Sequence, residues 1–82
     1  MPQRATVTVR YWAGAREAAG TATETHPGDT VGAVLDAAVA AHPALERVVA
    51  VSTFLLDGRA SDRGAAVSDG VTLEVLPPFA GG

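Results

Sequence analysis

Residues 29–43, DTVGAVLDAAVAAHP, are the stretch of this sequence with the clearest helical period. Its apolar residues recur at intervals of three and four, which places them along one stripe of an α-helix. These residues are Val31, Val34, Leu35, Ala38 and Val39. Asp29 and Thr30 offer an N-cap, and Pro43 cannot continue a helix. We therefore expect one main helix at about residues 31–42 that buries this stripe against a sheet.

Four segments around this helix have the pattern of β-strands. Residues 6–12 and 71–76 alternate between apolar and polar, so each has one face for burial. Residues 21–26 predict a weaker strand at an edge of the sheet, because an alanine and a charged glutamate interrupt the pattern. Residues 50–56 predict a strand that ends at a tight turn. The main helix thus lies between two pairs of strands.

The connecting segments supply no second long helix. Residues 13–19 are alanine-rich and predict a short helical turn closed by Gly20. Residues 44–49 predict one further turn of helix before the third strand. Glycine and aspartate interrupt residues 57–70, which predict an irregular excursion with at most a short strand in residues 59–67.

This order of elements predicts an α+β fold, the ubiquitin-like β-grasp. Its mixed sheet has the order ββαββ, with one main helix on one face. A ferredoxin-like sandwich is the alternative, and it would require a second full helix within residues 57–70. We expect residues 1–78 to form a single domain and residues 79–82 to project from it as a tail.

Composition limits the chemistry that the chain can perform. Its 82 residues include no cysteine, which excludes disulfides, cysteine-bound metals and thiol nucleophiles. The formal net charge of −3 is spread along the chain, and no apolar run has membrane-spanning length. We therefore expect a cytoplasmic protein with no nucleic-acid or membrane partner.

The remaining candidate catalytic groups are few. His26 and His42 lie far apart in the sequence, without the spacing of metal ligands, and we expect surface or capping roles for both. His42 precedes Pro43 at the expected end of the helix, where a histidine suits the helix dipole. The serines lack a nucleophile setting, and the glycines form no phosphate-binding loop. We expect no metal site, no bound cofactor and no catalytic activity of the chain on its own.

The last residues have the composition of an arm that is presented to another protein. They are Pro77, Pro78, Phe79, Ala80, Gly81 and Gly82. The prolines favour an extended backbone, because each fixes φ and disfavours a helical conformation in the residue before it. Glycine has no side chain to clash, so a carboxylate on Gly82 could pass through a narrow channel into a partner's active site. The alternative is a frayed end without a function.

Two large apolar residues fall on the face of the sheet that the helix does not cover. If the first and last strands pair in parallel, Trp12 and Leu76 share that outer face at the end from which the tail leaves. Exposed aromatic anchors dominate the energetics of protein interfaces, so we expect a docking surface there. The alternative is that Trp12 folds over the edge and packs with Phe54 or Phe79.

These features together resemble the MoaD/ThiS family of sulfur-carrier proteins, and within it the branch of molybdopterin synthase small subunits. Residues 10–20 resemble the opening strand of the family and the turn that follows it, which contains Arg16. Residues 30–35 resemble the start of its helix. Residues 76–82, with two prolines and a terminal Gly-Gly, resemble its closing strand and tail.

The resemblance implies a mechanism in which partners do the catalysis. An adenylyltransferase of the ubiquitin-activating type would use ATP to convert the Gly82 carboxylate into an acyl-adenylate, and sulfur would then replace AMP to leave a thiocarboxylate. The large subunit of molybdopterin synthase, in a heterotetramer with the carrier, would accept this sulfur for the molybdenum cofactor. Trp12, Leu76 and Arg16 are the residues that we expect to dock on these partners.

Three other functions remain open from the sequence. A carrier for thiamine, cysteine or specialised-metabolite synthesis would use the same tail chemistry. A ubiquitin-like modifier would be conjugated to lysines of target proteins. A plain β-grasp interaction module would not need its tail.

Overall fold

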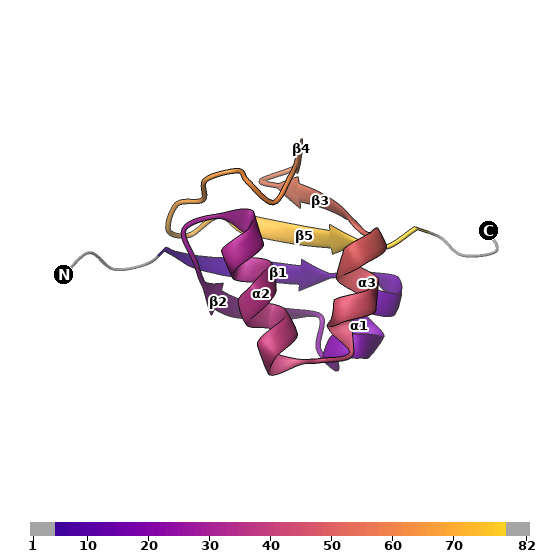
Figure 1. Cartoon of the computed structure of the whole chain (residues 1–82). Helices are drawn as coiled ribbons and strands as arrows, with labels where there is room; N and C mark the ends of the chain where they lie inside the picture. The colour runs from indigo at the N-terminus through magenta and orange to yellow at the C-terminus, as the bar shows by residue number, and fades with distance from the viewer. Residues whose placement is uncertain (1–4, 79–82) are drawn as a thin grey trace.

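The computed structural model describes residues 5–78 of the chain (Figure 1). It contains five strands and three helices, which follow one another as β1 (Thr6–Tyr11), α1 (Ala13–Ala19), β2 (Thr23–Pro27), α2 (Val31–Ala41), α3 (Leu45–Val51), β3 (Thr53–Leu56), β4 (Arg59–Ser61) and β5 (Thr72–Leu76). Within these residues, no helix combines the length and the hydrophobicity that crossing a membrane requires.

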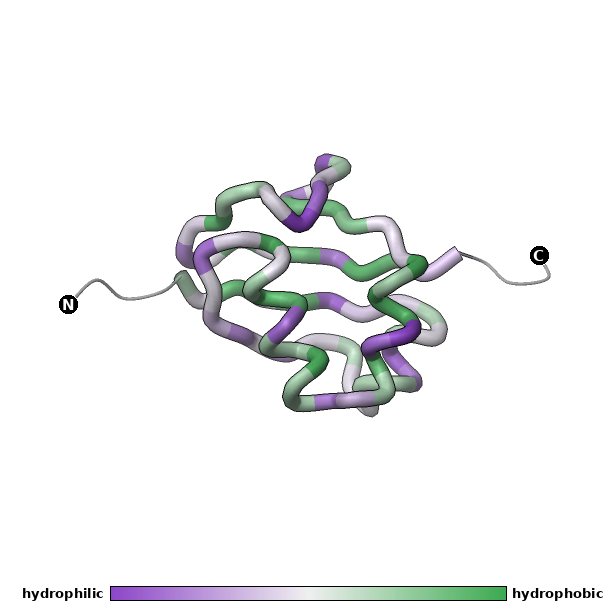
Figure 2. The backbone as a smooth tube through the Cα atoms, viewed as in Figure 1, coloured by the Kyte–Doolittle hydropathy of each residue, from purple (hydrophilic) through white to green (hydrophobic). Residues whose placement is uncertain are grey.

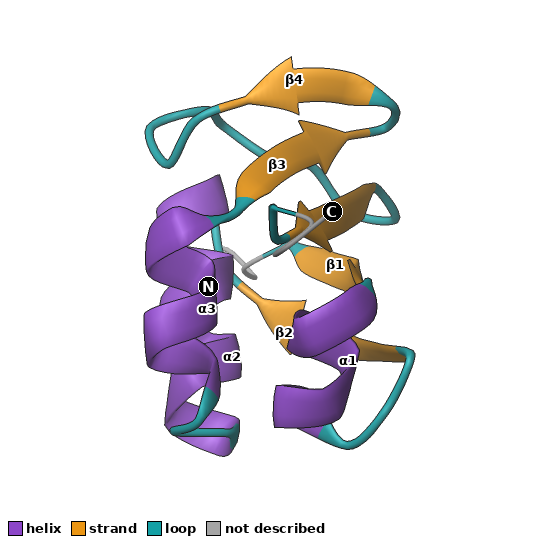
Figure 3. Ribbon diagram, turned by 90° about the vertical axis from the view of Figure 1, so that its right-hand side faces the viewer, coloured by secondary structure: helices purple, strands orange, loops and turns teal. Residues whose placement is uncertain are grey.

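The strands form one mixed sheet in the order β2-β1-β5-β3-β4. The two central strands, β1 and β5, are parallel, and the other neighbours are antiparallel. Helices α2 and α3 lie together on one face of this sheet, and α1 lies at the end where β1 finishes (Figure 3). No helix of residues 5–78 covers the opposite face (Figure 3). This arrangement confirms the predicted ubiquitin-like β-grasp and excludes the ferredoxin-like alternative, because residues 57–70 contain no helix.

The hydrophobic core lies between the sheet and the helices. Every second residue of the central strands is buried, and Figure 2 shows hydrophobic residues recurring along these strands and along α2. The buried residues of these two central strands are Val7, Val9, Tyr11, Leu73 and Val75. The predicted helical stripe faces them: Val31, Val34, Leu35 and Ala38 are fully buried, whereas Val39 is half-buried at the margin of the core. The helix phase read from the sequence is therefore confirmed.

The third strand begins later than predicted, because the helix before it is longer. Helix α3 spans Leu45–Val51 and covers residues 50 and 51, which the sequence assigned to the strand. Leu45 and Val49, one turn apart, are both buried, so the helical face has a place in the core. The Ser52 hydroxyl donates a hydrogen bond of 2.7 Å to the carbonyl of Val48, which marks the end of the helix.

The excursion between β4 and β5 caps the start of α2. The backbone N–H of Val31 donates to the carbonyl of Ala65 at 2.9 Å, and that of Gly32 donates to the carbonyl of Arg63 at 2.8 Å. These are two of the helical N–H groups that would otherwise lack a partner. The predicted short strand in this stretch is β4, and the rest of residues 57–70 is irregular, as expected.

Candidate functional site

Trp12 stands at the junction between the central strand β1 and helix α1. Its backbone is extended, with φ −115° and ψ 150°, and its N–H donates to the carbonyl of Val75 at 3.2 Å. The pairing of β1 with β5 thus continues by one residue, and the Trp12 side chain continues the alternation of β1. It therefore lies on the face without helices, where it is 40% exposed.

Two charged side chains hold the Trp12 ring on this face. The indole Nε1 donates a hydrogen bond of 2.9 Å to Glu74 Oε1, and the Arg10 guanidinium lies over the ring, 4.5 Å from its centroid. Arg10 and Glu74 are opposite each other in the register of β1 with β5. Packing of Trp12 with Phe54 is excluded, because Phe54 is buried on the helix-covered face. Packing of Trp12 with Phe79, the other possibility, falls outside the described residues.

A surface pocket of about 300 Å³ opens beside the ring. It is lined by Trp12, Ala13, Glu74, Leu76 and Pro77, at the end of β5 from which the chain leaves the sheet. We call it the Trp12 pocket. The structure thus brings together Trp12 and Leu76, two of the residues predicted to dock on a partner. Leu55, opposite Glu74 in β3, shares this face and is half-buried; the sequence analysis did not single it out.

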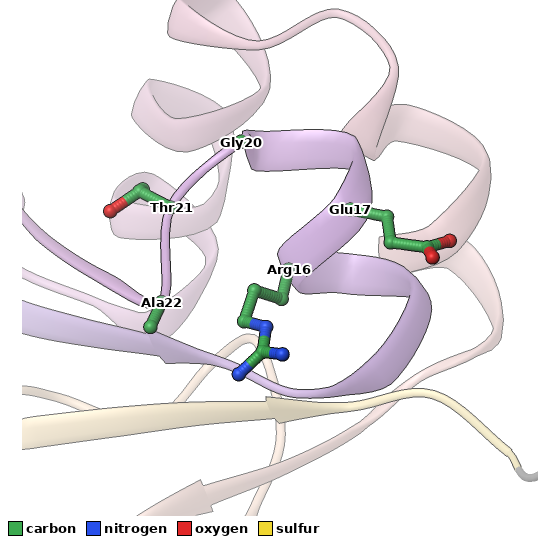
Figure 4. Close-up of a pocket in the computed structure, with 5 residues that line it drawn as sticks. All are labelled: Arg16, Glu17, Gly20, Thr21 and Ala22. Carbon is green, nitrogen blue, oxygen red and sulfur yellow. The ribbon is translucent and has the colours of Figure 1, made fainter.

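Arg16, the third predicted docking residue, lies in a different place. It lines a second pocket of about 420 Å³ around the turn between α1 and β2, together with Glu17, Gly20, Thr21 and Ala22. Figure 4 shows the side chains of Arg16 and Glu17 pointing in different directions from α1. Arg16 is therefore not part of the Trp12 pocket, and its role in docking stays a prediction.

The predicted tail begins at the edge of the Trp12 pocket. Pro77 is half-buried against it, and Pro78 is exposed. The predictions for Phe79, Ala80, Gly81 and Gly82, including the projecting tail, fall outside the described residues.

A polar cluster lies on the helix-covered face of the sheet, at the edge strand β2. Three side chains surround the Glu24 carboxylate. The Tyr11 hydroxyl donates to Oε2 at 2.6 Å, His26 Nε2 lies 2.5 Å from Oε2, and His42 Nε2 lies 2.9 Å from Oε1. We call Glu24, His26 and His42 the Glu24 cluster.

The sequence analysis missed this cluster because its members are distant along the chain. His42 caps the end of α2, as expected, but 18 residues separate it from Glu24. Two signals could have found the cluster. Glu24 and His26 are two residues apart in one strand, so they share a face, and the crossover helix of a β-grasp ends above the neighbouring edge strand.

The cluster keeps Glu24 ionised. Burial opposes ionisation, but the hydrogen bonds from Tyr11, His42 and His26 and the charge of His26 outweigh it and lower the pKa of Glu24 to about 2. Burial, together with the hydrogen bond to Glu24 and its negative charge, raises the pKa of the Tyr11 hydroxyl far above its usual value. Tyr11 therefore remains a donor and Glu24 an acceptor throughout the neutral range.

The fold is that of small β-grasp proteins, which include ThiS/MoaD-like sulfur carriers and ubiquitin-like small archaeal modifiers. The chain belongs to the ThiS family, whose model matches residues 9–82. Among curated proteins, none matches the sequence.

Solved structures agree with this assignment. SAMP1 from Haloferax volcanii is 36% identical, with a TM-score of 0.83, over 94% of this chain and 99% of that chain. The BexX/CysO complex from Amycolatopsis orientalis contains a chain that is 26% identical, with a TM-score of 0.80, over 93% of this chain and 99% of that one. A complex of subunits 1 and 2 of molybdopterin-converting factor from Helicobacter pylori contains a similar fold, at 20% identity and a TM-score of 0.69, over 94% and 99% of the two chains. Two of these three similar structures are thus complexes with another protein.

Proposed function

We propose that this chain is a sulfur carrier for molybdopterin synthesis, and that Gly82 holds the sulfur as a terminal thiocarboxylate. The observation that carries the proposal is the Trp12 pocket, which lies at the end of β5, where the chain leaves the sheet at Pro77. A partner that bound this pocket would therefore be next to the point from which the residues after Pro77 continue. The match to the ThiS family, which extends through residue 82, supports the same interpretation.

The proposed chemistry takes place at one carboxylate. The Gly82 carboxylate attacks the α-phosphate of ATP in an adenylyltransferase of the ubiquitin-activating type, and pyrophosphate leaves. Sulfide released by the sulfur donor then attacks the acyl-adenylate carbonyl, the carbonyl–phosphate bond breaks, AMP leaves, and the thiocarboxylate remains on Gly82. Since the sequence contains no cysteine, no side-chain thiol of this chain can hold the sulfur. Catalysis belongs to the partners, which supply the leaving group and the positioning.

The docking role follows from the chemistry of the pocket. Trp12 and Leu76 present apolar surface, and Arg10 and Glu74 frame the ring with opposite charges. An apolar anchor with a polar rim is the usual composition of a binding hot spot. The adenylyltransferase and the large subunit of molybdopterin synthase would bind this surface one after the other. The large subunit would do so within a heterotetramer that contains the carrier.

The molybdopterin branch is supported by the similarity of residues 76–79, Leu-Pro-Pro-Phe, to that branch of the family. A carrier for thiamine, cysteine or specialised-metabolite synthesis would undergo the same activation. These pathways differ in the enzyme that accepts the sulfur, so acceptor enzymes distinguish them.

A second candidate function is that of a ubiquitin-like modifier. It is favoured by the 36% identity to the small archaeal modifier protein SAMP1 over 94% of this chain. In that case a lysine amine of a target protein, rather than sulfur, would attack the acyl-adenylate; AMP would leave, and an isopeptide bond with Gly82 would form.

Intact-mass measurement distinguishes these functions. The chain is incubated with ATP, a sulfur source and the adenylyltransferase of its source organism. Exchange of one oxygen for sulfur on the intact chain is expected for a carrier, whereas covalent adducts with lysines of other proteins are expected for a modifier. The thiocarboxylated chain is then offered in parallel to the molybdopterin synthase large subunit, a thiazole synthase and a cysteine-synthase-like enzyme. Sulfur transfer to either of the last two alone would refute the molybdopterin assignment.

A further inference from the structure

The Glu24 cluster gathers three potential metal ligands from two elements of the fold. One ligand atom from each of Glu24, His26 and His42 can be chosen so that all three lie within 4.8 Å of one another. We propose that these side chains form a binding site for one divalent transition-metal ion, with zinc as the best match. This site is independent of the proposed sulfur chemistry, since none of its residues lines the Trp12 pocket.

The donor set selects the class of metal. Two imidazoles and one carboxylate suit zinc and its neighbours in the first transition row, whereas magnesium and calcium prefer oxygen ligands alone. Both imidazoles direct Nε2 at the carboxylate, at 2.5 Å for His26 and 2.9 Å for His42. A metal ion would take the place of the protons that lie between these nitrogens and the carboxylate oxygens.

The distances require only small movements. Zinc binds imidazole nitrogen at about 2.0–2.1 Å and carboxylate oxygen at about 2.0–2.2 Å, so tetrahedral ligand atoms lie roughly 3.3 Å apart. The close contacts of 2.5 and 2.9 Å would open by less than about 1 Å to reach this spacing. Rotation of the three side chains supplies a change of that size, and the backbone can stay in place.

The backbone positions of the ligands are already fixed. Glu24 and His26 lie two residues apart in β2 and pair with Val9 and Val7 of the central strand. His42 caps α2, and its backbone N–H donates to the carbonyl of Ala38 at 2.9 Å. Preorganised ligands lose little conformational entropy when a metal binds.

The surroundings also suit a metal. The Tyr11 hydroxyl, 2.6 Å from Glu24 Oε2, would orient the carboxylate as a hydrogen-bonding group behind the ligands. The side chains of His26, Glu24 and His42 are 12%, 22% and 26% exposed, so an ion can enter from solvent. The same exposure leaves room for water as a fourth ligand. Bound metal would fasten the end of α2 to the edge strand β2.

Calorimetric titration of the full, untagged chain with zinc chloride at neutral pH tests the site. We expect one equivalent of zinc per chain and a rise in melting temperature with zinc concentration, because an ion that binds only the folded state stabilises it. Cobalt(II) in place of zinc should give the intense visible absorption of a tetrahedral site. Magnesium chloride at the same concentrations should produce no binding.

Matched variants locate the site. Glu24→Gln and His42→Gln should each weaken zinc binding at least tenfold, since each removes one ligand but retains a polar side chain of similar size. Glu46→Gln, at an exposed glutamate in α3, should bind zinc as the unaltered chain does. Circular dichroism of each variant shows whether it is folded, and deletion of Gly82 should leave zinc binding unchanged. Absence of zinc binding by the unaltered chain, equal binding by all variants, or an equal response to magnesium would each overturn the proposal and leave the cluster as a hydrogen-bonded network.

Discussion

The two faces of the sheet hold their polar side chains in different ways. On the face without helices, Arg10 and Glu74 flank an indole ring that remains 40% exposed. Under the helices, by contrast, the Glu24 carboxylate receives three partners from three elements of the fold. The first arrangement keeps an apolar group in contact with solvent, and the second satisfies a charge within the domain. Changes on the open face should therefore affect binding, whereas changes under the helices should affect stability.

Deletion of Gly82 should have the largest effect on function and almost none on stability. The reacting carbonyl must come within about 3–3.5 Å of its attacker, and one extended residue moves it by about 3.3–3.6 Å. We expect thiocarboxylate formation, measured by intact mass, to be abolished. An added residue after Gly82 should do the same.

The control for that prediction is a thermal melt of each variant, which should match that of the unaltered chain. If the deletion variant still accepted sulfur, Gly82 would not be the carrier residue, and the proposed function would fail.

Leu35→Ala should cause the largest loss of stability. Leu35 is fully buried in α2, so truncation removes apolar contacts and leaves a cavity, at a cost of about 2–5 kcal/mol. Chemical denaturation measures this as a change in the unfolding free energy. Ala33→Gly, at an exposed position of the same helix, serves as the control and should cost about 1 kcal/mol. An effect of Leu35→Ala no larger than that of Ala33→Gly would contradict the observed helix phase.

Glu24→Gln should lower stability in a pH-dependent way. The pKa of Glu24 is about 2 in the folded chain, against a usual value of 4.5. Protonation therefore favours the unfolded state, and the contribution of the carboxylate is present above about pH 4.5 and is lost as the pH falls towards 2. After allowance for partial exposure, we expect Glu24 to contribute on the order of 2–3 kcal/mol at pH 7.

Denaturant titrations of both proteins in metal-free buffer, from pH 7 to pH 2, measure this contribution. The difference in unfolding free energy should shrink across the lower part of that range. A difference that stayed constant down to pH 2 would show that the charge of Glu24 does not matter to the fold.

Trp12→Ala should have only a small effect on stability and still weaken docking. The side chain is partly exposed and rests on the sheet surface, so we expect the unfolding free energy to change by about 1 kcal/mol or less. The affinity for the adenylyltransferase, measured by calorimetry, should fall by at least about tenfold if the ring is a hot spot.

Val51→Ala is the matched control for Trp12→Ala. Val51 is 63% exposed on α3 and does not line the Trp12 pocket, so its truncation should leave affinity unchanged. Equal losses of affinity for the two variants, or no loss for Trp12→Ala, would show that this pocket is not the docking site.

The sequence predicted those parts of the fold in which one period dominates. Helix α2 and the strands β1 and β5 have strong periods, and their buried faces were identified correctly. The boundary between α3 and β3 was wrong, because the apolar residues of 45–56 suit a buried helical face as well as a strand. Only packing of Leu45 and Val49 into the core decides between the two.

The Trp12 pocket and the Glu24 cluster also differ in how far the sequence predicted them. Strand parity was enough to place Trp12 and Leu76 on one face, and the structure brings both to one pocket. Parity could not reveal the hydrogen bond from Trp12 to Glu74, which depends on how two side chains turn. The Glu24 cluster was missed altogether, since His42 meets β2 only through the path of the crossover helix.

The central position of β5 has a mechanical consequence. Force applied to residues after Pro77 would load a strand that is hydrogen-bonded to β1 on one side and to β3 on the other. Such a strand cannot be peeled away one bond at a time, because both rows of hydrogen bonds are sheared together. An edge strand such as β2 would instead open like a zipper. A partner, or a molecular motor, could therefore pull on the residues after Pro77 while the β-grasp domain stays folded.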